Sequence, residues 1–345
     1  MFSNYDRNNN YPAKLLKKHV YNLRKNGKAV FHTERNIIHP VDRKVIKSQL
    51  RKNNHMGSTR DGKLIYFVDY ASSPDVIKEI SRLREITFRK VGEGTGRKAD
   101  KDRYDQVYRH LVLWDEDNLE IAGSYRIGFC REIIDNHGTE GLYSSTLFNY
   151  SELFESKLKY SLELGRSFVQ AKYWNTNALT YLWQGLGKIL MKNPDIQYLF
   201  GAVSLSNSYL NEAKELIVFF YKKWFPPAGQ LATAKNGYRI PTKRNEELGA
   251  IFSSGDFNEE FRILKKTLRV YGYSVPTLFK QYCELCEPGG VEFIDFGIDN
   301  EFQNCLDGLI ILDVEKIKES KKRLYIYSDG IPVLKQSSTP VLAEV

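Results

Sequence analysis

Cysteine is scarce in this sequence of 345 residues, and several common site signatures are missing. Four cysteines are too few for a disulfide framework and favour a reducing compartment. Cys283 and Cys286 make one Cys-x-x-Cys pair without a second pair at zinc-finger spacing, so ordinary thiols are favoured over a metal site. No HExxH, Walker A or GxGxxG sequence is present. We therefore expect no metal and no tightly bound cofactor.

Long hydrophobic runs are missing as well. The apolar stretch 215–225 contains two lysines and falls short of the ~20 residues that a membrane span needs. The first residues, MFSNYDRNNNY, are polar and lack the apolar stretch of a secretory signal. The sequence thus predicts a cytoplasmic protein without a membrane span.

Positive charge is concentrated at one end of the chain. The net charge is +9, but residues 1–60 carry fourteen Lys and Arg against three acids, and the remainder is close to neutral. A basic N-terminal arm at 1–60 indicates an anionic partner: nucleic acid, a membrane surface or an acidic protein. Residues 14–25 and 40–51 predict short helices with an apolar side, of the type that lies on an anionic membrane. Packing of these helices against the body is the alternative.

Strand and helix patterns alternate through the rest of the chain. Hydrophobic residues make up 42% of the sequence, enough for a sizeable core. Periodicity predicts strands at 63–70, 110–114, 120–129, 162–170, 198–205, 291–296, 308–312 and 323–327, and helices at 73–88, 174–192, 209–224, 258–269 and 275–286. This mixture predicts an α/β fold, of the α+β kind with a mixed sheet. We expect a core at 61–228, a C-terminal elaboration at 229–335 packed on it, and a tail at 336–345.

One apolar strand contains a glutamate and an arginine, although charged residues are rarely buried without a partner. They are Glu163 and Arg166 in the run LELGRSFV (162–169). These positions face opposite sides of a regular strand, but Gly165 permits a bulge that would change this. Glu163 is a candidate general base, because burial and nearby charge tune the proton affinity of a carboxylate. A buried Glu–Arg pair that only stabilises the fold is the alternative.

Two further clusters suit substrate binding. The strand 162–170 leads through KYWNTN (172–177) into a helix, and the free N–H groups of a helix start bind phosphate. An ordinary capped helix is the alternative there. The second cluster is a mixed-charge loop opposite a strand arginine, able to orient an amino or carboxylate group. It consists of Arg84, Phe88, Asp102, Asp105 and Arg126.

Several of these segments carry a family resemblance. The runs LELGRSFV (162–169), YLWQGL (181–186) and YLFGAV (198–203) resemble the hemolysin-type branch of the GNAT-related N-acyltransferases, which includes ornithine-lipid and glycine-lipid N-acyltransferases. This branch is similar to acyl-homoserine-lactone synthases. Their ordered pattern matches Arg84 and Phe88, Asp102 and Asp105, Gly123 and Arg126, and Glu163 and Arg166. The resemblance covers about residues 64–225, with 275–312 also similar, and it implies a GNAT-like acyltransferase fold.

The resemblance implies an enzyme that moves a fatty acyl group from an acyl carrier protein thioester to the amine of an amino acid, in lyso-amino-acid lipid synthesis. Glu163 would be the general base, with Arg166 beside it, and the mixed-charge cluster would bind the acceptor. Tyr221 is similar to the GNAT tyrosine that protonates the leaving thiol. The thioester would enter a cleft where the strand at 167–169 splays from the strand at 203–205, and backbone N–H groups there would hold the oxyanion. The thioester and its phosphopantetheine would lie along Ser167, Phe168, Val169, Lys172, Trp174, Asn175, Thr176 and Asn177.

The donor and the localisation follow from two further features. General GNATs carry a glycine-containing pyrophosphate loop, whereas this chain has WNTNA (174–178) at the corresponding place. This departure favours a carrier-protein phosphopantetheine, with its single phosphate, over coenzyme A. Carrier proteins are acidic and the product would be a lipid. The basic arm therefore predicts peripheral association with the anionic inner face of the membrane.

Three other functions remain open at this point. An acyl-homoserine-lactone-like synthase is the first alternative, although no tryptophan lies between Phe88 and Asp102, where those synthases usually have one. A non-catalytic, membrane-interacting hemolysin-like protein is the second. Nucleic-acid binding rests on the basic arm alone, without a recognition motif, and is not expected.

Overall fold

Residues 11–26, 34–53 and 55–327 are described by the structure, a computed structural model of the chain. The predicted tail at 336–345 and the first ten residues of the predicted arm lie outside the described residues. In the described part, no helix is both long enough and apolar enough to span a bilayer.

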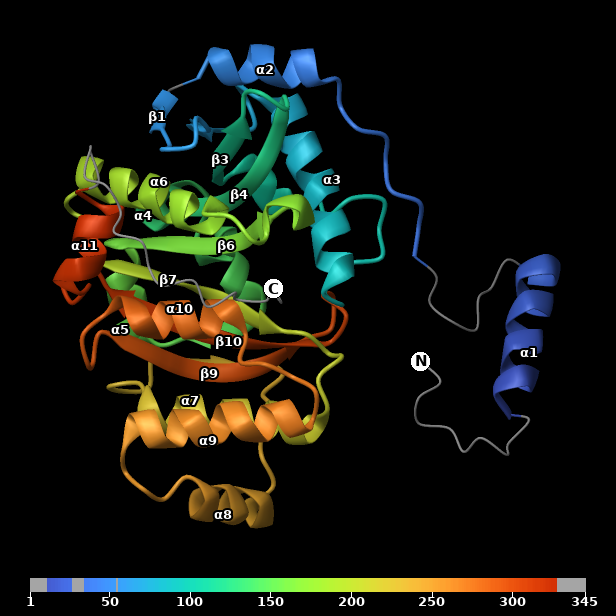
Figure 1. The fold of residues 1–345 in the computed structure, drawn as a ribbon, viewed down its shortest axis with the longest axis vertical. Coiled ribbons are helices and arrows are strands. Elements are labelled where there is room, and N and C mark those ends of the chain that lie inside the picture. The colour runs from blue at the N-terminus through green and yellow to red at the C-terminus, as the bar shows by residue number, and fades with distance from the viewer. Residues whose placement is uncertain (1–10, 27–33, 54, 328–345) are drawn as a thin grey trace.

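A mixed sheet of eight strands, counted over the described residues, forms the centre of the molecule (Figure 1). In spatial order its strands are β1 (His55–Ser58), β2 (Leu64–Val68), β3 (Arg109–Asp115), β4 (Glu120–Phe129), β6 (Ser161–Val169), β7 (Tyr198–Leu205), β10 (Cys305–Asp313) and β9 (Val291–Asp299). Within this sheet β6 and β7 run parallel, and the other neighbours are antiparallel. A small separate sheet pairs β5 (Phe148–Tyr150) with β8 (Ala232–Ala234).

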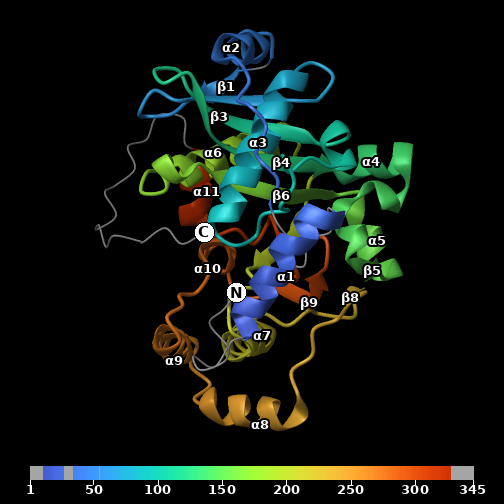
Figure 2. The ribbon, with the colours of Figure 1, turned by 90° about the vertical axis from the view of Figure 1, so that its right-hand side faces the viewer.

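Helices cover both faces of the sheet and both of its ends. Figures 1 and 2 place α2 at one end of the molecule and α8 at the other. The described helices are α1 (Tyr11–Asn26), α2 (Arg43–Arg51), α3 (Pro74–Lys90), α4 (Cys130–His137), α5 (Glu152–Leu158), α6 (Ala178–Lys192), α7 (Asn211–Trp224), α8 (Thr242–Ile251), α9 (Phe257–Val270), α10 (Thr277–Leu285) and α11 (Glu319–Tyr325). Short 3-10 turns lie at Arg103–Gln106, Thr139–Gly141, Tyr143–Thr146 and Ala171–Tyr173.

The alternation of β3 explains why the sheet is buried on both faces. Leu111 and Leu113 belong to the core that includes α6, whereas Val112 and Trp114 belong to the core that includes α2 and α3. Successive side chains of a strand point to opposite faces, so a strand between two cores reads as an unbroken apolar run. The same double burial is why the run HLVLW could be recognised in the sequence.

Most of the predicted elements are confirmed, with ends shifted by a few residues. The strand predicted at 323–327 is wrong, because these residues belong mainly to α11, which packs against α6. Its aromatic Tyr325 contacts Trp183 on α6, so tertiary packing outweighs the strand preference of a short aromatic run. The strand β8 and the helices α4, α5 and α8 were not predicted.

The C-terminal region is continuous with the predicted core. β10 pairs with β7 over the full length of both strands, from Leu306–Leu205 to Asp313–Tyr198, and β9 pairs with β10. Residues 291–313 therefore complete the central sheet, while α8 and α9 pack outside it on α7. The boundary at 228 stays a prediction, and the sheet crosses it.

The two predicted arm helices differ in their surroundings. Ile46 and Leu50 of α2 are buried in the core that contains α3, and Asp42 caps this helix by accepting from the Lys44 N–H at 2.7 Å. By contrast, α1 leaves three of its apolar side chains exposed: Leu16, Val20 and Leu23. The alternative of packing against the body thus applies to α2, and α1 presents an apolar side without a cover from the described residues.

Candidate active site

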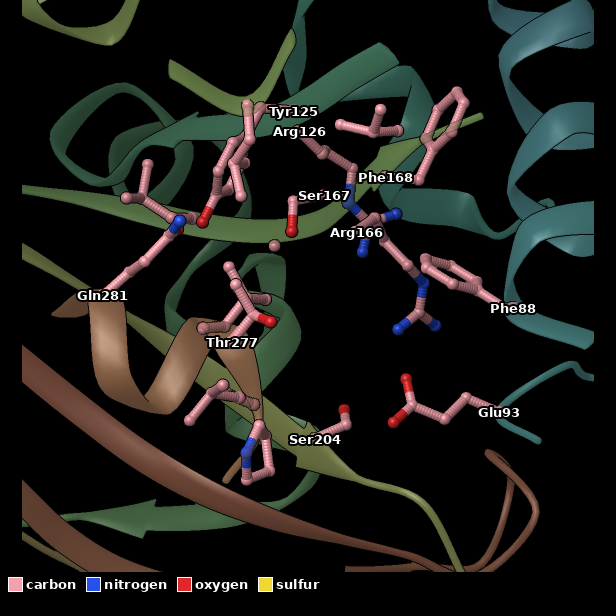
Figure 3. A pocket seen from close by; sticks show the side chains of 18 of the residues that line it. Phe88, Glu93, Tyr125, Arg126, Arg166, Ser167, Phe168, Ser204, Thr277 and Gln281 are labelled. Atoms are coloured by element: carbon pink, nitrogen blue, oxygen red, sulfur yellow. The ribbon is translucent and has the colours of Figure 1, made fainter. Parts of the chain in front are cut away.

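A cavity of about 280 Å³ lies where β6 and β7 separate. These strands pair at Ser161–Tyr198, Leu162–Leu199 and Glu163–Phe200, and beyond Glu163 they diverge although both continue. Figure 3 shows Arg166, Ser167 and Phe168 of β6 above the cavity, with Ser204 of β7 and Thr277 of α10 opposite. The edge of β6 that faces β7 has no strand partner beyond Glu163, so backbone N–H groups along it are available to a ligand.

About half of the residues that the sequence singled out line this cavity. They are Phe88, Arg126, Glu163, Arg166, Ser167, Phe168, Val169, Trp174 and Thr176. The others do not line it: Arg84, Asp102, Asp105, Lys172, Asn175, Asn177 and Tyr221. These nine residues come from four of the predicted segments, and residues close in sequence can differ in whether they reach the cavity.

Glu163 is held rigidly at the point where the strands part. Its side chain is buried, with 2% of the residue exposed. Oε1 accepts from the Ser144 N–H at 2.7 Å, and Oε2 accepts from the Tyr143 N–H at 3.1 Å and from the hydroxyl of Tyr108. A carboxylate has about four acceptor positions, so three are filled and one remains. These bonds fix the direction of the carboxylate.

A backbone irregularity in β6 turns Arg166 toward the cavity. Arg166 has a φ of +50°, in the left-handed region that non-glycine residues rarely adopt. The pairing of β6 with β4 skips at this point, between Ser124–Phe168 and Arg126–Gly165. The sequence prediction of a bulge is confirmed, but its unusual backbone falls on Arg166 and not on Gly165.

Three arginines and three aspartates form a buried charge network beside the cavity. Arg84 pairs with Asp105 at 2.8 Å and Asp100 at 3.1 Å, and Arg126 pairs with Asp102 at 2.7 Å. Burial alone would raise the pKa of Asp105, but Arg84 and Arg126 hold it well below the ordinary value. Arg84 and Asp105 are fully buried, so they orient their neighbours and do not line the cavity.

Arg166 belongs to the same network and connects it to the cavity. Its Nε lies 3.2 Å from Asp100 Oδ2 and its Nη2 3.7 Å from Asp102 Oδ2, and its Nη1 donates to the Tyr143 hydroxyl at 3.3 Å. Because three cations face three anions, the network is balanced within itself. Arg126 also lines the cavity, and its Nε and Nη2 have no hydrogen-bond partner among the described residues. A free guanidinium edge of this kind suits a carboxylate.

The segment before α6 is less suited to phosphate than the sequence suggests. The Trp174 indole donates to the Val169 carbonyl at 2.8 Å, and the Thr176 hydroxyl donates to the Tyr173 carbonyl at 2.7 Å. Lys172 forms an ion pair with Glu120, on the far side of this turn from the cavity wall. The helix itself begins at Ala178, four residues later than predicted, because residues 171–173 form a 3-10 turn.

Tyr221 is packed away from the cavity. It is 1% exposed and contacts the rings of Phe225, Phe279 and Phe293. The structure brings another tyrosine pair to the cavity instead: the hydroxyls of Tyr125 on β4 and Tyr282 on α10 are hydrogen-bonded to each other. Tyr221 lies on the buried side of α7, where it packs among aromatic rings.

Two acids that sequence reasoning missed also line the cavity. Glu93 follows α3, and Asp307 lies on β10. Burial, with a smaller contribution from Asp307, raises the pKa of Glu93 to about 8. Burial also raises the pKa of Asp307 to about 7. Asp307 sits in the apolar run CLDGLIILD, and an acid in a run of this kind was the signal that could have found it.

Asp307 should make the stability of the protein fall as the pH rises. A carboxyl whose pKa is raised by folding binds its proton more tightly in the native state, so its stabilising contribution is present at low pH and lost on deprotonation. Between about pH 4 and pH 7 the expected loss is up to about 1.4 kcal/mol per pH unit. In urea unfolding followed over this range, Asp307→Asn should flatten the profile and exceed the wild type in stability at pH 8. A variant less stable than the wild type at pH 8 would contradict this.

The chain resembles known proteins in two ways: one domain matches a family model, and nearly the whole chain matches known enzymes. Residues 83–184 match the family model described as an acetyltransferase (GNAT) domain, so the chain contains a GNAT-type acyltransferase domain. A glycine N(alpha)-acyltransferase from Phocaeicola vulgatus is 34% identical over 85% of this chain and 93% of that protein. One from Bacteroides thetaiotaomicron is 33% identical over 84% and 89%. The chain belongs to the glycine N(alpha)-acyltransferase family.

More distant similarities exist as well. An L-ornithine N(alpha)-acyltransferase from Agrobacterium fabrum is 28% identical over 50% of this chain and 67% of that protein. A solved structure of a CoA-dependent acyl-homoserine lactone synthase, BjaI with SAM and isopentyl-CoA, matches 82% of this chain and 97% of that chain at 12% identity, with a TM-score of 0.37. The predicted resemblance to N-acyltransferases is confirmed, and the fold is a GNAT-like α/β fold with a large mixed sheet.

Proposed function

We propose that this protein transfers a fatty acyl group from an acyl carrier protein thioester to the amine of an amino acid, giving a lyso-amino-acid lipid. Glycine is the first acceptor to consider, because the relatives that match most of the chain are named for it. The observation that carries the proposal is the cavity between the diverging β6 and β7, with Glu163 fixed where they part. In acyl transfer from a thioester, an unpaired strand edge can stabilise the oxyanion and a buried carboxylate can act as the base.

The chemistry follows from these parts. The thioester lies along the free edge of β6, where backbone N–H groups stabilise the negative oxygen that develops on the carbonyl carbon. The acceptor amine attacks that carbon, forming the C–N bond, and Glu163 takes a proton from the amine through its remaining acceptor position. The C–S bond then breaks. We assign the protonation of the departing sulfur to the Tyr125–Tyr282 pair, since Tyr221 does not line the cavity.

The acceptor would be oriented by the charge network. Arg126 offers a free guanidinium edge to the acceptor carboxylate, and Phe88 forms part of the adjoining wall. Arg84, Asp102 and Asp105 would act behind it, because they hold Arg126 and the neighbouring Arg166 in place. We therefore treat Arg84, Asp102 and Asp105 as positioning residues.

A carrier-protein donor remains our proposal over coenzyme A. The turn before α6 has no glycine loop for a pyrophosphate, and Lys172 is already paired with Glu120. Trp174 and Thr176 remain at the cavity to contact a pantetheine arm. With a carrier-protein donor, this turn would have to bind only one phosphate group, whereas coenzyme A carries three.

The test is product analysis with purified protein. Wild-type protein is incubated with acyl carrier protein thioesters or acyl-CoA and a panel of amino acids, and the products are identified by mass spectrometry. We expect N-acyl amino acids, glycine being the best acceptor, and faster turnover with the carrier-protein donor. Absence of any N-acyl amino acid would overturn the proposal. Formation of a lactone from S-adenosylmethionine would favour the synthase alternative, and a wild type without any transfer would favour a non-catalytic membrane role.

We also propose that α1 holds the enzyme at the anionic cytoplasmic face of the membrane. The apolar residues of α1 are exposed beside its basic ones, which suits a helix lying in a bilayer surface. Basic residues close to an anionic bilayer contribute about 1 kcal/mol each. Deletion should stop before residue 34, since the Arg35 and Ile38 N–H groups bond to the loop at 96–98 and α2 is part of the core.

Deletion of residues 1–33 should therefore weaken membrane binding by at least about tenfold at low salt, and the difference should shrink as salt screens the charges. Co-sedimentation with vesicles of phosphatidylglycerol and phosphatidylethanolamine measures this, with phosphatidylcholine vesicles as the uncharged control. Transfer to a soluble acceptor should be unaffected. Equal binding of the full-length and truncated proteins at low salt would assign α1 a different role.

A further inference from the structure

Two carboxyl groups in the cavity have no partner that matches their charge. Glu93 is half-buried and lines the cavity, and no hydrogen bond or ion pair reaches its carboxyl group from the described residues. Asp307 is 2% exposed, and its Oδ1 has no hydrogen-bond partner within the described part of the chain. An isolated buried carboxylate is costly, so native proteins pair it with a cation or hydrogen-bond donors.

Neighbouring acids show that this fold does satisfy its carboxylates elsewhere. Asp299, at the end of β9, accepts from the Tyr143 hydroxyl at 3.0 Å and from the Glu301 N–H at 2.8 Å. Asp295 on the same strand pairs with Lys222 and Arg239 at 3.1 Å each. Glu93 and Asp307 are therefore exceptions among the acids of this region, and they are the ones that reach the cavity.

The charges around the two carboxyl groups do not neutralise them. The charged groups that face Glu93 are Asp307 and Arg166. Asp307 faces the charges of Asp299 and Arg166, and its carboxyl group also has a hydrogen bond with the Ser204 side chain, which carries no charge. Arg166 is already matched by Asp100 and Asp102. The balanced network thus leaves two surplus acids in one cavity, with room for a positive charge.

The positions of the two acids suit an amine held under the thioester. Asp307 lies directly opposite Ser204 of β7 in the antiparallel pairing, so both belong to the cavity wall that faces β6. Figure 3 shows Glu93 pointing into the cavity, between the guanidinium of Arg166 and the hydroxyl of Ser204. An amine bound here would face the free edge of β6 across the cavity. The thioester would lie along that edge.

We propose that Glu93 and Asp307 form the subsite that binds the ammonium group of the acceptor, and that one of them takes its first proton. This inference rests on the proposed function. An amino acid arrives as R–NH₃⁺, which has no lone pair and cannot attack. Transfer of one proton to the carboxylate gives R–NH₂ and a neutral carboxylic acid. The C–N bond then forms, Glu163 takes the second proton, and the C–S bond breaks.

The two-proton scheme gives the three acids different tasks. Glu163 is bound by two backbone N–H groups and a tyrosine hydroxyl and serves the amine after attack. Glu93 and Asp307 carry the raised proton affinity that a group needs to accept a proton from an ammonium ion near neutral pH. A single base would have to release its first proton before it could take the second.

The test compares Glu93→Gln and Asp307→Asn with Glu301→Gln, an exposed glutamate outside the cavity. Glycine binding is measured by isothermal titration calorimetry at pH 8, together with the separate KM values for glycine and for the acyl thioester. We expect both cavity variants to bind glycine at least tenfold more weakly and to raise its KM, with the thioester KM within twofold and the control unchanged. Glycolate lacks the ammonium group, so its affinity should be similar for the wild type and the two cavity variants.

Each outcome decides one of the two proposals. Glycine binding and KM that are unchanged in both cavity variants overturn this subsite, even when the wild type forms N-acyl glycine. A thioester KM that rises as much as the glycine KM also overturns it, because the acids would then shape the whole cavity. A wild type that binds glycine through these acids but transfers no acyl group keeps the subsite and overturns the proposed function. Circular dichroism of each variant shows that the isosteric changes leave the fold intact.

Discussion

Glu163→Gln should lower the rate of acyl transfer by roughly 100-fold or more, with little change in stability. A glutamine cannot accept the proton of the attacking amine. It can still keep the local structure, because its oxygen accepts from the Ser144 N–H and its amide group donates to the Tyr108 hydroxyl, which already accepts from the Tyr143 N–H at 2.8 Å. The variant therefore separates the chemistry from the packing of the loop at 142–146.

Single-turnover rates with a saturating acyl donor measure this effect, and thermal unfolding measures stability in parallel. Glu155→Gln, on the exposed side of α5, is the matched control and should behave as the wild type. Transfer rates within tenfold of the wild type in Glu163→Gln would show that the glutamate stabilises the fold without acting as a base. Loss of both the transfer rate and the stability would also indicate that Glu163 has a structural role.

Gly201→Ala should disrupt the site through the backbone, without touching any charged residue. A Cβ at Gly201 would overlap the carbonyl oxygen of Leu164, far inside van der Waals contact, and a backbone atom cannot move aside as a side chain can. This contact lies just beyond the last β6–β7 pair, where the two strands begin to diverge. Overpacking of this type costs typically about 1–3 kcal/mol, and we expect the upper end of that range.

Gly165→Ala is the matched control on the facing strand. A Cβ there meets no other atom within 4 Å, so the free energy of unfolding should change by less than about 1 kcal/mol. Urea unfolding and transfer assays on both variants measure the difference. If Gly201→Ala is as stable as the wild type, the close contact between Gly201 and Leu164 is not needed. Other residues would then determine the shape of the cavity.

The sequence gives a reliable account of the individual elements because their patterns are local. Strands with both faces buried read as continuous apolar runs, as in 109–115, and amphipathic helices such as α7 and α9 read as regular periodicities. The prediction fails at 323–327, where a short aromatic run is consistent with either element. Contact with Trp183 of α6 then decides in favour of a helix.

The candidate site was predictable only where its residues lie on one strand or follow a family pattern. Glu163, Arg166 and Phe168 stand together on β6, and their identities within an apolar run indicate a special role. Arg84 and Asp105 match the same pattern, yet they are buried behind the wall, because a sequence pattern shows which residues interact and not which of them face a cavity. Tyr221 likewise matches a motif and lies in an aromatic core.

By itself the sequence determined the order of the elements, the basic arm, and the buried acid at Glu163. Each of these depends on residue types over a short stretch of chain. Only the tertiary structure decided that Glu93 and Asp307 meet in the cavity where β6 and β7 diverge. These two acids come from a loop after α3 and from β10, more than 200 residues later, so no local pattern links them. The pKa values of both acids are raised mainly because the fold removes them from water, and this effect exists only in the folded chain.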